Sequence, residues 1–170
     1  MDTFGLPNLD MIQHPGGRMR IQDLNRFRYL NIAVKATQSA ATVALPASSA
    51  TDWAFDNNQF ISEPSLHSTT VNNTRFYPPI NGYYLCGCEI SDGGTANFFV
   101  DLGINGVVQD RLGSQSNVVD STGGMTIRKL TVGDYIHFRV NNGGIASTIY
   151  GDATQNSLTW AFMAYLGEGP

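Results

Sequence analysis

The sequence predicts an all-β protein in which short antiparallel strands pack as a sandwich or barrel. Charged residues make up only 14% of the 170 residues, and glycine, serine, threonine, asparagine and valine recur along the chain. This composition favours short strands and tight turns over helices. Apolar and polar residues also alternate in short stretches that turn signals separate. A jelly-roll sandwich of roughly eight to ten strands fits this pattern best.

The stretch 73–90 is expected to hold the central strand and the turn that precedes it. Pro78-Pro79 cannot donate ladder hydrogen bonds, and Asn81-Gly82 tolerates positive φ, so the chain turns there. The run Tyr83-Tyr84-Leu85-Cys86 that follows is uncharged and rich in β-forming residues. Such a strand is buried on both faces, so we expect one face to meet the opposite sheet and the other to meet a partner.

Two regions are expected along the chain: an extended N-terminal arm, residues 1–32, and a folded domain, residues 33–170. The beginning of the arm is rich in proline and glycine and has few large apolar residues, so it cannot form a core of its own. The end of the arm fits a short helix capped by Asp23 and equally a strand in which Phe27 and Tyr29 alternate with arginines.

Turn residues mark the ends of the strands expected in the domain. Asn105-Gly106 closes a two-residue hairpin, and Asp134 caps a turn at Gly133. Trp53, Phe55 and Phe60 are expected to face the core. The strands expected besides the central one are 33–45, 97–104, 107–112, 124–130, 135–140 and 157–166.

Two further features bear on the core and on association. The strand 157–166 is apolar on both faces, which fits one face on the core and the other in a subunit interface. Cys86 and Cys88 lie two positions apart and point to the same side of the central strand. A disulfide between them would be strained, so both are expected to be free, buried thiols.

Charge is distributed unevenly between the two ends of the sequence. Residues 1–35 carry a net charge of +2 and the remainder −6, within a formal total of −4. A basic arm on an acidic body fits docking onto an acidic surface and fits a solvated tail equally well. The residues expected to dock the arm are Arg18, Arg20, Arg26, Phe27 and Arg28.

The sequence contains no pattern typical of an enzyme. His14, His67 and His137 lie far apart, and no nucleophile motif surrounds a serine. His137 is expected to be a half-buried strand residue. The aspartates lack the spacing of a calcium loop, and the arginines lack the stacking platforms of nucleic-acid-binding proteins. Neither a secretory signal nor an apolar run long enough to span a membrane is present. We therefore predict no catalytic residues, no cofactor, no metal, and neither nucleic acid nor membrane as a partner.

Three motifs follow one another in a familiar order. They are Phe76-x-x-Pro79-x-x-Gly82-x-Tyr84, then Gly123-Gly124-Met125-x-x-x-x-Leu130-x-x-Gly133-Asp134, then Asn156-Ser157-x-x-x-x-Phe162. In these motifs residues 33–166 resemble the jelly-roll domain shared by tumour necrosis factor (TNF) and the globular head of the complement q subcomponent. The segment 55–75 is similar to versions found in virion proteins of tailed bacteriophages. The last strand departs from the family pattern at Thr159, where an aromatic residue is usual.

The resemblance implies a TNF-like jelly roll that forms a homotrimer about a threefold axis. It implies that Leu85, Gly87, Gly123 and Met125 form the trimer interface. On the central strand, the alternating residues Tyr84, Cys86 and Cys88 would instead face the core of the single subunit.

Two hypotheses for the function follow. In the first, the protein is a trimeric decoration or head-fibre protein on the capsid surface of a tailed bacteriophage, docked through its arm to the major capsid protein or another virion protein. In the second, it is a receptor-binding tip that recognises a host-surface glycan or protein. The loops expected at 64–74, 91–96, 113–122 and 141–156 contain one aromatic residue, Tyr150. Because sugars stack on exposed aromatic rings, this scarcity favours the first hypothesis.

Overall fold

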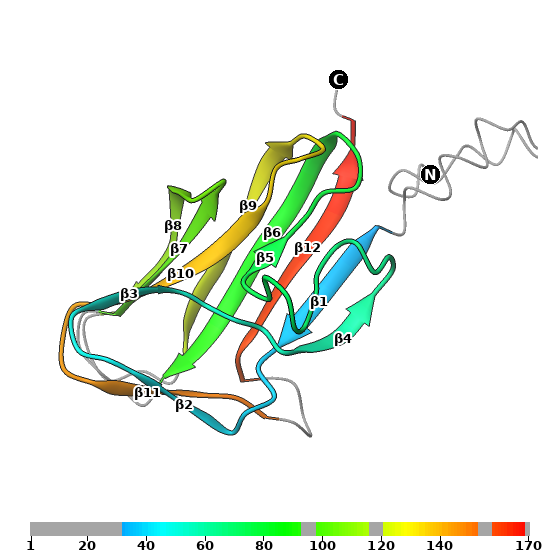
Figure 1. Cartoon of the computed structure of the whole chain (residues 1–170). Helices are drawn as coiled ribbons and strands as arrows, with labels where there is room; N and C mark the ends of the chain where they lie inside the picture. The colour runs from blue at the N-terminus through cyan, green and yellow to red at the C-terminus, as the bar shows by residue number, and fades with distance from the viewer. Residues whose placement is uncertain (1–31, 93–97, 116–120, 153–157, 169–170) are drawn as a thin grey trace, which may run out of the picture.

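A computed structural model describes residues 32–92, 98–115, 121–152 and 158–168, with the side chain of residue 115 left out. This part of the chain forms twelve β-strands in two antiparallel sheets that face each other (Figure 1). The expected all-β sandwich is therefore confirmed. The expected arm lies outside the described residues, except for Ile32, which is buried in the core.

The strands differ in length, and the longest one, β6, runs through the middle of its sheet. In chain order they are β1 (Ala33–Thr37), β2 (Thr42–Leu45), β3 (Ser49–Asp52), β4 (Asn57–Ile61), β5 (Arg75–Phe76), β6 (Gly82–Asp92), β7 (Phe98–Ile104), β8 (Val107–Gln115), β9 (Thr122–Leu130), β10 (Ile136–Asn142), β11 (Ser147–Tyr150) and β12 (Trp160–Gly167).

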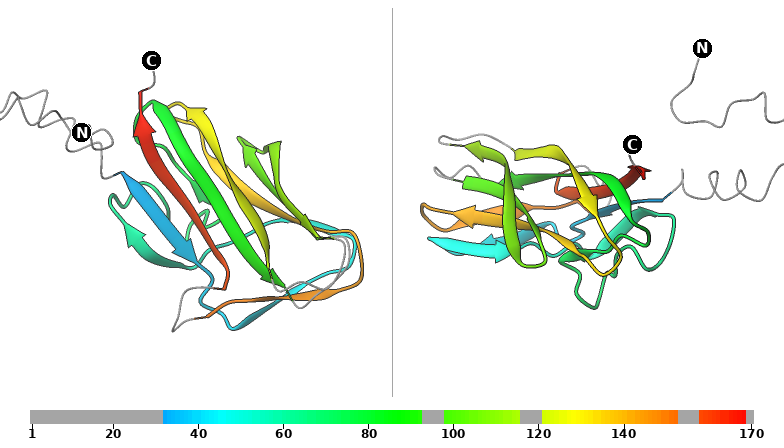
Figure 2. Two further views of the ribbon diagram at one scale, coloured as in Figure 1. Left: turned by 180° about the vertical axis from the view of Figure 1, so that it is seen from behind. Right: turned by 90° about the horizontal axis from the view of Figure 1, so that it is seen from above.

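The two sheets contain seven and five strands. In the seven-stranded sheet the order is β2-β11-β6-β12-β1-β4. Strand β9 also pairs with β6, along Gly82–Ile90, whereas β11 pairs only with Ser91 and Asp92 at the end of β6. In the five-stranded sheet the order is β3-β10-β7-β8, and β5 also pairs with β10. Because β1 and β12 pair antiparallel, β1 begins and β12 ends at the same end of the sandwich (Figure 2).

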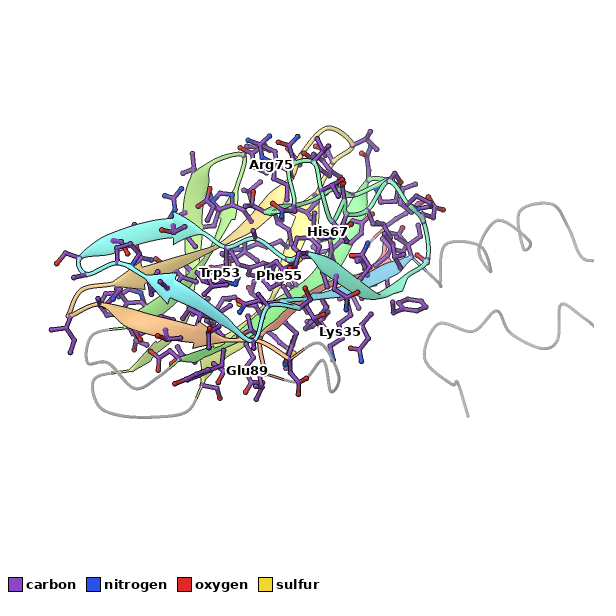
Figure 3. The ribbon with its side chains drawn as sticks, turned by 60° about the horizontal axis from the view of Figure 1, so that its bottom comes forward. Lys35, Trp53, Phe55, His67, Arg75 and Glu89 are labelled. Atoms are coloured by element: carbon purple, nitrogen blue, oxygen red, sulfur yellow. The ribbon has the colours of Figure 1, made fainter. Side chains whose placement is uncertain are left out.

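Aromatic rings from three parts of the chain fill the space between the sheets. Phe55 packs edge-on against Phe76 and Phe138, with ring centroids 5.8 and 6.3 Å apart. Trp53 lies beside this group and donates a hydrogen bond of 3.0 Å from its indole Nε1 to Gln38. Figure 3 shows Trp53 and Phe55 in the middle of the molecule. Edge-to-face ring packing adds stability beyond the burial of area alone.

The inward side of β6 completes this core. Tyr84, Cys86 and Cys88 are almost fully buried, and both cysteines are free, as expected. Burial raises the pKa of the Cys86 thiol to about 12, so at neutral pH the thiol is protonated and unreactive. The Tyr84 hydroxyl donates a hydrogen bond of 2.8 Å to the carbonyl oxygen of Ile80.

The turns at one end of the sandwich agree with the sequence. Asn105 and Gly106 have φ angles of 52° and 84° and close the β7–β8 hairpin. The Asp134 carboxylate accepts hydrogen bonds of 2.8 Å from the backbone N–H of Thr131 and of 2.7 Å from the side-chain amide of Asn105. Asp134 therefore caps its own turn and also links that turn to the turn of the β7–β8 hairpin.

Several expected elements differ in the structure. The strand expected at 33–45 is two strands, β1 and β2, because the chain leaves the sheet after Thr37 and the Gln38 side chain is buried. The loop expected at 141–156 contains β11, and β12 begins at Trp160, later than expected. The loop expected at 64–74 contains two buried residues, Leu66 and His67, and the His67 ring stacks on Phe76.

The sequence-based expectations for two single residues, Phe60 and His137, were also wrong. Phe60 does not face the core: it lies opposite Lys35, which points away from the core, and is 54% exposed. A register shift in the β1–β4 pairing, between Lys35 and Ala36, separates this position from the core-facing positions of β1. His137 is fully buried instead of half-buried, because Gly103 on β7 lies directly beneath its ring.

Candidate self-association surface

The outer side of the seven-stranded sheet is covered mainly by apolar side chains. Residues directly opposite each other in an antiparallel pair point to the same face of a sheet. On β6 the core-facing residues alternate with residues that point outward, and their partners on the neighbouring strands do the same. We call this surface the apolar face, which consists of Phe60, Tyr83, Leu85, Met125, Ile127, Trp160, Phe162 and Ala164.

The apolar face runs across the sheet from one edge to the other. Gly87 lies between Met125 on β9 and Phe162 on β12, and Phe162 in turn lies opposite Lys35 on β1. Lys35 then lies opposite Phe60 on the edge strand β4. In the single chain Met125 is 66% exposed and Phe60 is 54% exposed. The described residues of one chain therefore leave large apolar side chains at both edges of the sheet exposed to water.

The sequence predicted interface residues at Leu85, Gly87, Gly123 and Met125, and the structure brings all four to this outer side. At Gly87 a Cβ atom would lie 2.7 Å from both Met125 and Phe162, so glycine lets those two side chains close over the strand. At Gly123 a Cβ atom would lie only 2.0 Å from the Cys88 carbonyl oxygen. That these residues contact another subunit remains a prediction.

Sequence reasoning missed the contributions of β1 and β4 to this surface, whereas it expected one face of the strand 157–166, which contains most of β12, to lie in a subunit interface. The Lys35 ammonium lies 5.3 Å from the centre of the Trp160 ring, and the Lys129 ammonium lies 6.0 Å from the centre of the Tyr83 ring. Cations over aromatic rings are weakly attracted to them, and the stems of the lysines cover part of the rings. The expected docking residues Arg18, Arg20, Arg26, Phe27 and Arg28 lie outside the described residues.

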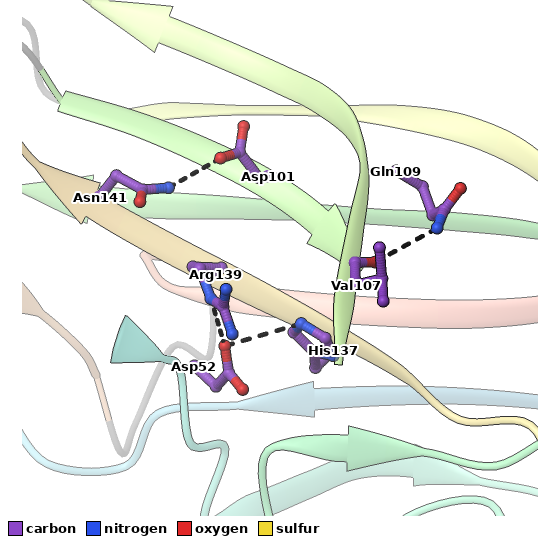
Figure 4. A network of polar contacts seen from close by, with 7 residues as sticks. All are labelled: Asp52, Asp101, Val107, Gln109, His137, Arg139 and Asn141. Carbon is purple, nitrogen blue, oxygen red and sulfur yellow. Dashed lines mark hydrogen bonds and ion pairs between the residues drawn. The ribbon is translucent and has the colours of Figure 1, made fainter. Parts of the chain in front are cut away.

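The outer side of the five-stranded sheet has the opposite character, because charges of alternating sign cross it. Asp52 lies opposite Arg139, and Arg139 lies opposite Asp101, which in turn lies opposite Arg111. Arg139 donates to Asp52 at 2.7 Å and Arg111 donates to Asp101 at 3.1 Å. Asn141 also donates to Asp101, at 2.8 Å (Figure 4). This surface satisfies its own charges.

His137 is buried within this charged surface. Its Nε2 atom lies 3.6 Å from an Asp52 carboxylate oxygen, and neither ring nitrogen has a hydrogen-bond partner among the described residues. Burial lowers the pKa of His137, the neighbouring Arg139 and Arg75 lower it further, and Asp52 opposes them. The imidazole is therefore neutral at physiological pH and serves as packing.

Within the described part of the chain, no three His, Cys, Asp or Glu side chains gather in a way that could hold a metal ion. Nor does any helix there reach the length and apolarity needed to cross a membrane. The outward apolar surface is thus the feature that most needs a functional explanation.

Comparison with known proteins identifies the fold. No protein-family model and no curated protein matches the chain. Among solved structures, Eiger TNF from S. frugiperda is 14% identical over 82% of this chain and 94% of its own, with a TM-score of 0.54. The globular domain of zebrafish complement 1qA protein is 12% identical over 78% and 95%, with a TM-score of 0.51. PRD1 vertex protein P5 is 13% identical over 81% and 99%, with a TM-score of 0.58.

At these identities the similarity is one of fold. The seven- and five-stranded sheets form a jelly roll of the kind found in TNF and in the globular domain of complement q. The fold expected from the three sequence motifs is therefore confirmed. Because this fold supports many functions, the function has to be inferred from the surfaces of this chain.

The buried histidine predicts how stability depends on pH. The pKa of His137 is below 6.5 in the folded protein, so below about pH 6.5 the unfolded chain binds a proton that the folded chain does not. We expect the free energy of unfolding to fall as pH is lowered from 7.5 to 5.5, by at most about 1.4 kcal/mol per pH unit for this group.

The check is denaturant unfolding of the wild type and of His137→Gln at both pH values. The variant should lose less stability on acidification than the wild type, although His67, whose pKa burial also lowers, still contributes. Equal losses in the two proteins would show that His137 is not held neutral by the fold.

Proposed function

We propose that this protein is a non-enzymatic structural protein that assembles into a homotrimer through its apolar face. The apolar face itself carries the proposal. Soluble monomers rarely leave a contiguous apolar patch in water that extends across several strands, and such patches mark interaction surfaces. The residues on it come from four strands, β4, β12, β6 and β9, and β1, which pairs with both β4 and β12, joins them in register.

The arrangement of the face favours a ring of subunits. Met125 and Ile127 project from the edge strand β9, whereas Phe60 projects from the edge strand β4 on the far side of the sheet. If the β9 side of one subunit packs on the β4 side of the next, the contact is head-to-tail, and a closed ring results when the rotation closes. The sequence resemblance to TNF-like domains supports a ring of three.

We further propose a location on the capsid surface of a tailed bacteriophage, as a decoration or head-fibre protein. The sequence resemblance to tailed-phage virion proteins supports this location, and so does the similarity in fold to a phage vertex protein, PRD1 P5. The partner would be the major capsid protein or another virion protein. The arginine-rich segment 1–32 would supply the contact, since arginine pairs well with surface carboxylates.

The trimer is tested by comparing two aspartate substitutions. Met125 and Val132 are 66% and 63% exposed in the single chain, so Asp at either position should leave the fold of one subunit intact. Met125→Asp would place a carboxylate in the proposed interface, where burying an unpaired charge costs several kcal/mol. Val132 lies in the turn between β9 and β10 and is not part of the apolar face, so Val132→Asp is the control.

We expect light scattering at micromolar concentration to give a trimeric mass for the wild type and for Val132→Asp, and a monomeric mass for Met125→Asp. A monomeric wild type would contradict the proposed assembly. A trimeric Met125→Asp with unchanged thermal stability would mean that trimers form through a different surface.

Docking is tested with a variant that begins at Ile32. This residue is kept because it is buried and its carbonyl oxygen accepts a hydrogen bond of 2.9 Å from the Tyr165 backbone N–H. We expect the truncated protein to remain a folded trimer and to fail to rebind virus particles stripped of the protein. Rebinding of full-length protein should weaken as salt rises, because exposed ion pairs are screened over about 10 Å at 0.1 M.

A full-length control with Arg18, Arg20, Arg26 and Arg28 replaced by serine separates charge from chain length, and it should rebind weakly. If the truncated trimer rebinds as well as the full-length protein, the docking surface lies on the jelly roll. If the truncated protein unfolds, the segment is part of the fold and is not an anchor.

A further inference from the structure

Two unpaired charges lie among the apolar residues of the seven-stranded sheet. Glu89 follows Leu85 and Gly87 on the outward side of β6. Lys35 is on β1, where it lies opposite Phe162 of β12. Figure 3 shows Glu89 and Lys35 on the same side of the molecule, away from Arg75. Within the described part of the chain, neither of them forms a hydrogen bond or an ion pair. Both are half-buried before any partner is added.

The surroundings of Glu89 form a hollow in the surface. The hollow has a volume of about 330 Å³, and its walls include Met125 and Trp160 as well as the glycines of β9. Gly123 lies opposite Glu89 and leaves one side of the carboxylate uncovered. Among the described residues, the hollow combines the apolar side chains of Met125 and Trp160 with one carboxylate, that of Glu89. This combination is suited to a lysine side chain, whose stem is apolar and whose tip is a cation.

Lys35 of the same chain is poorly placed to fill this hollow. It lies on β1, and β12 separates β1 from β6. Strands in a sheet are about 4.8 Å apart, so the two backbones are about 10 Å apart. The Lys35 ammonium lies over the ring of Trp160, which stands between the two charges. Within one subunit the two charges therefore lie on strands on either side of β12, and no ion pair joins them.

We propose that, in the assembled protein, Glu89 of one subunit forms an ion pair with Lys35 of the neighbouring subunit, inserted into the hollow beside Met125. This inference rests on the proposed self-association of the apolar face. Burying either charge without a partner is strongly unfavourable, so an interface that covers both has to pair them. A head-to-tail contact does so, because it brings the β1 side of one subunit onto the β9 side of the next.

Lys129 is the alternative cation, and its position makes it the control. It lies on β9, on the same half of the face as the hollow, and its ammonium lies over Tyr83. A head-to-tail contact joins opposite halves of the face, so the neighbour's Lys129 is not brought to Glu89. If Lys35 is the partner of Glu89, exchanging the charges of Glu89 and Lys35 should restore the trimer, whereas exchanging those of Glu89 and Lys129 should not.

The experiment is a charge exchange followed by light scattering over a dilution series. We expect Glu89→Lys and Lys35→Glu each to raise the concentration at which the trimer dissociates by at least tenfold. The double variant Glu89→Lys/Lys35→Glu should return to within a few-fold of the wild type, because the pair is restored with reversed polarity. The double variant Glu89→Lys/Lys129→Glu should stay as weak as Glu89→Lys alone.

A second cycle with neutral side chains, Glu89→Gln and Lys35→Gln, covers the case in which charge reversal prevents folding. Its two changes should be strongly non-additive. Additive effects in both cycles, or recovery with Lys129 instead of Lys35, would overturn the pair while leaving the trimer intact. If the effect of Glu89→Lys disappears in protein that begins at Ile32, the partner is an arginine of the N-terminal segment and the inference is wrong. A monomeric wild type would instead remove the proposed function.

Discussion

Strand β6 has two faces to bury, and the described part of one chain covers only one of them fully. It pairs with β12 on one side and with β9 on the other, so it cannot move to the margin of the sheet. Tyr84, Cys86 and Cys88 face the five-stranded sheet and are almost fully buried. Leu85 and Gly87 alternate with them and lead outward to the exposed Met125 and its neighbours. Because alternation along a strand is fixed, covering one face leaves the other uncovered.

The outer surfaces of the two sheets meet water in different ways. On the five-stranded sheet, Asp52 pairs with Arg139 and Asp101 pairs with Arg111, so that surface is polar and electrically balanced within one subunit. On the seven-stranded sheet the apolar side chains lack cover and Glu89 lacks a cation among the described residues. The contrast indicates which side of the sandwich is built for association, because only that side gains from a partner.

Local patterns in the sequence predicted much of this fold, and non-local pairing accounts for the errors. The alternation of apolar and polar residues predicted the long strands, and Asn105-Gly106 predicted the hairpin, because these features depend on residues close in the sequence. The outward position of Phe60 depends on its pairing across β1, and the full burial of His137 depends on Gly103 in another strand. The resemblance to TNF-like domains implied the interface positions on β6 and β9, and the alternation of outward-pointing and core-facing residues along β6 agrees with it. The contributions of β1 and β4 were not predicted, since only the strand order places these strands in the same sheet as β6.

The central claim is that the apolar face is covered in solution by another copy of the chain. Hydroxyl-radical labelling with mass spectrometry measures the solvent exposure of individual side chains in the intact protein. Met125 and Ile127 are 66% and 54% exposed in one subunit, and Val132 and Val107, which lie elsewhere, are 63% and 61% exposed. After correction for intrinsic reactivity, we expect strong protection of Met125 and Ile127 but not of the two valines. Equal labelling of the two pairs at micromolar concentration would contradict the claim.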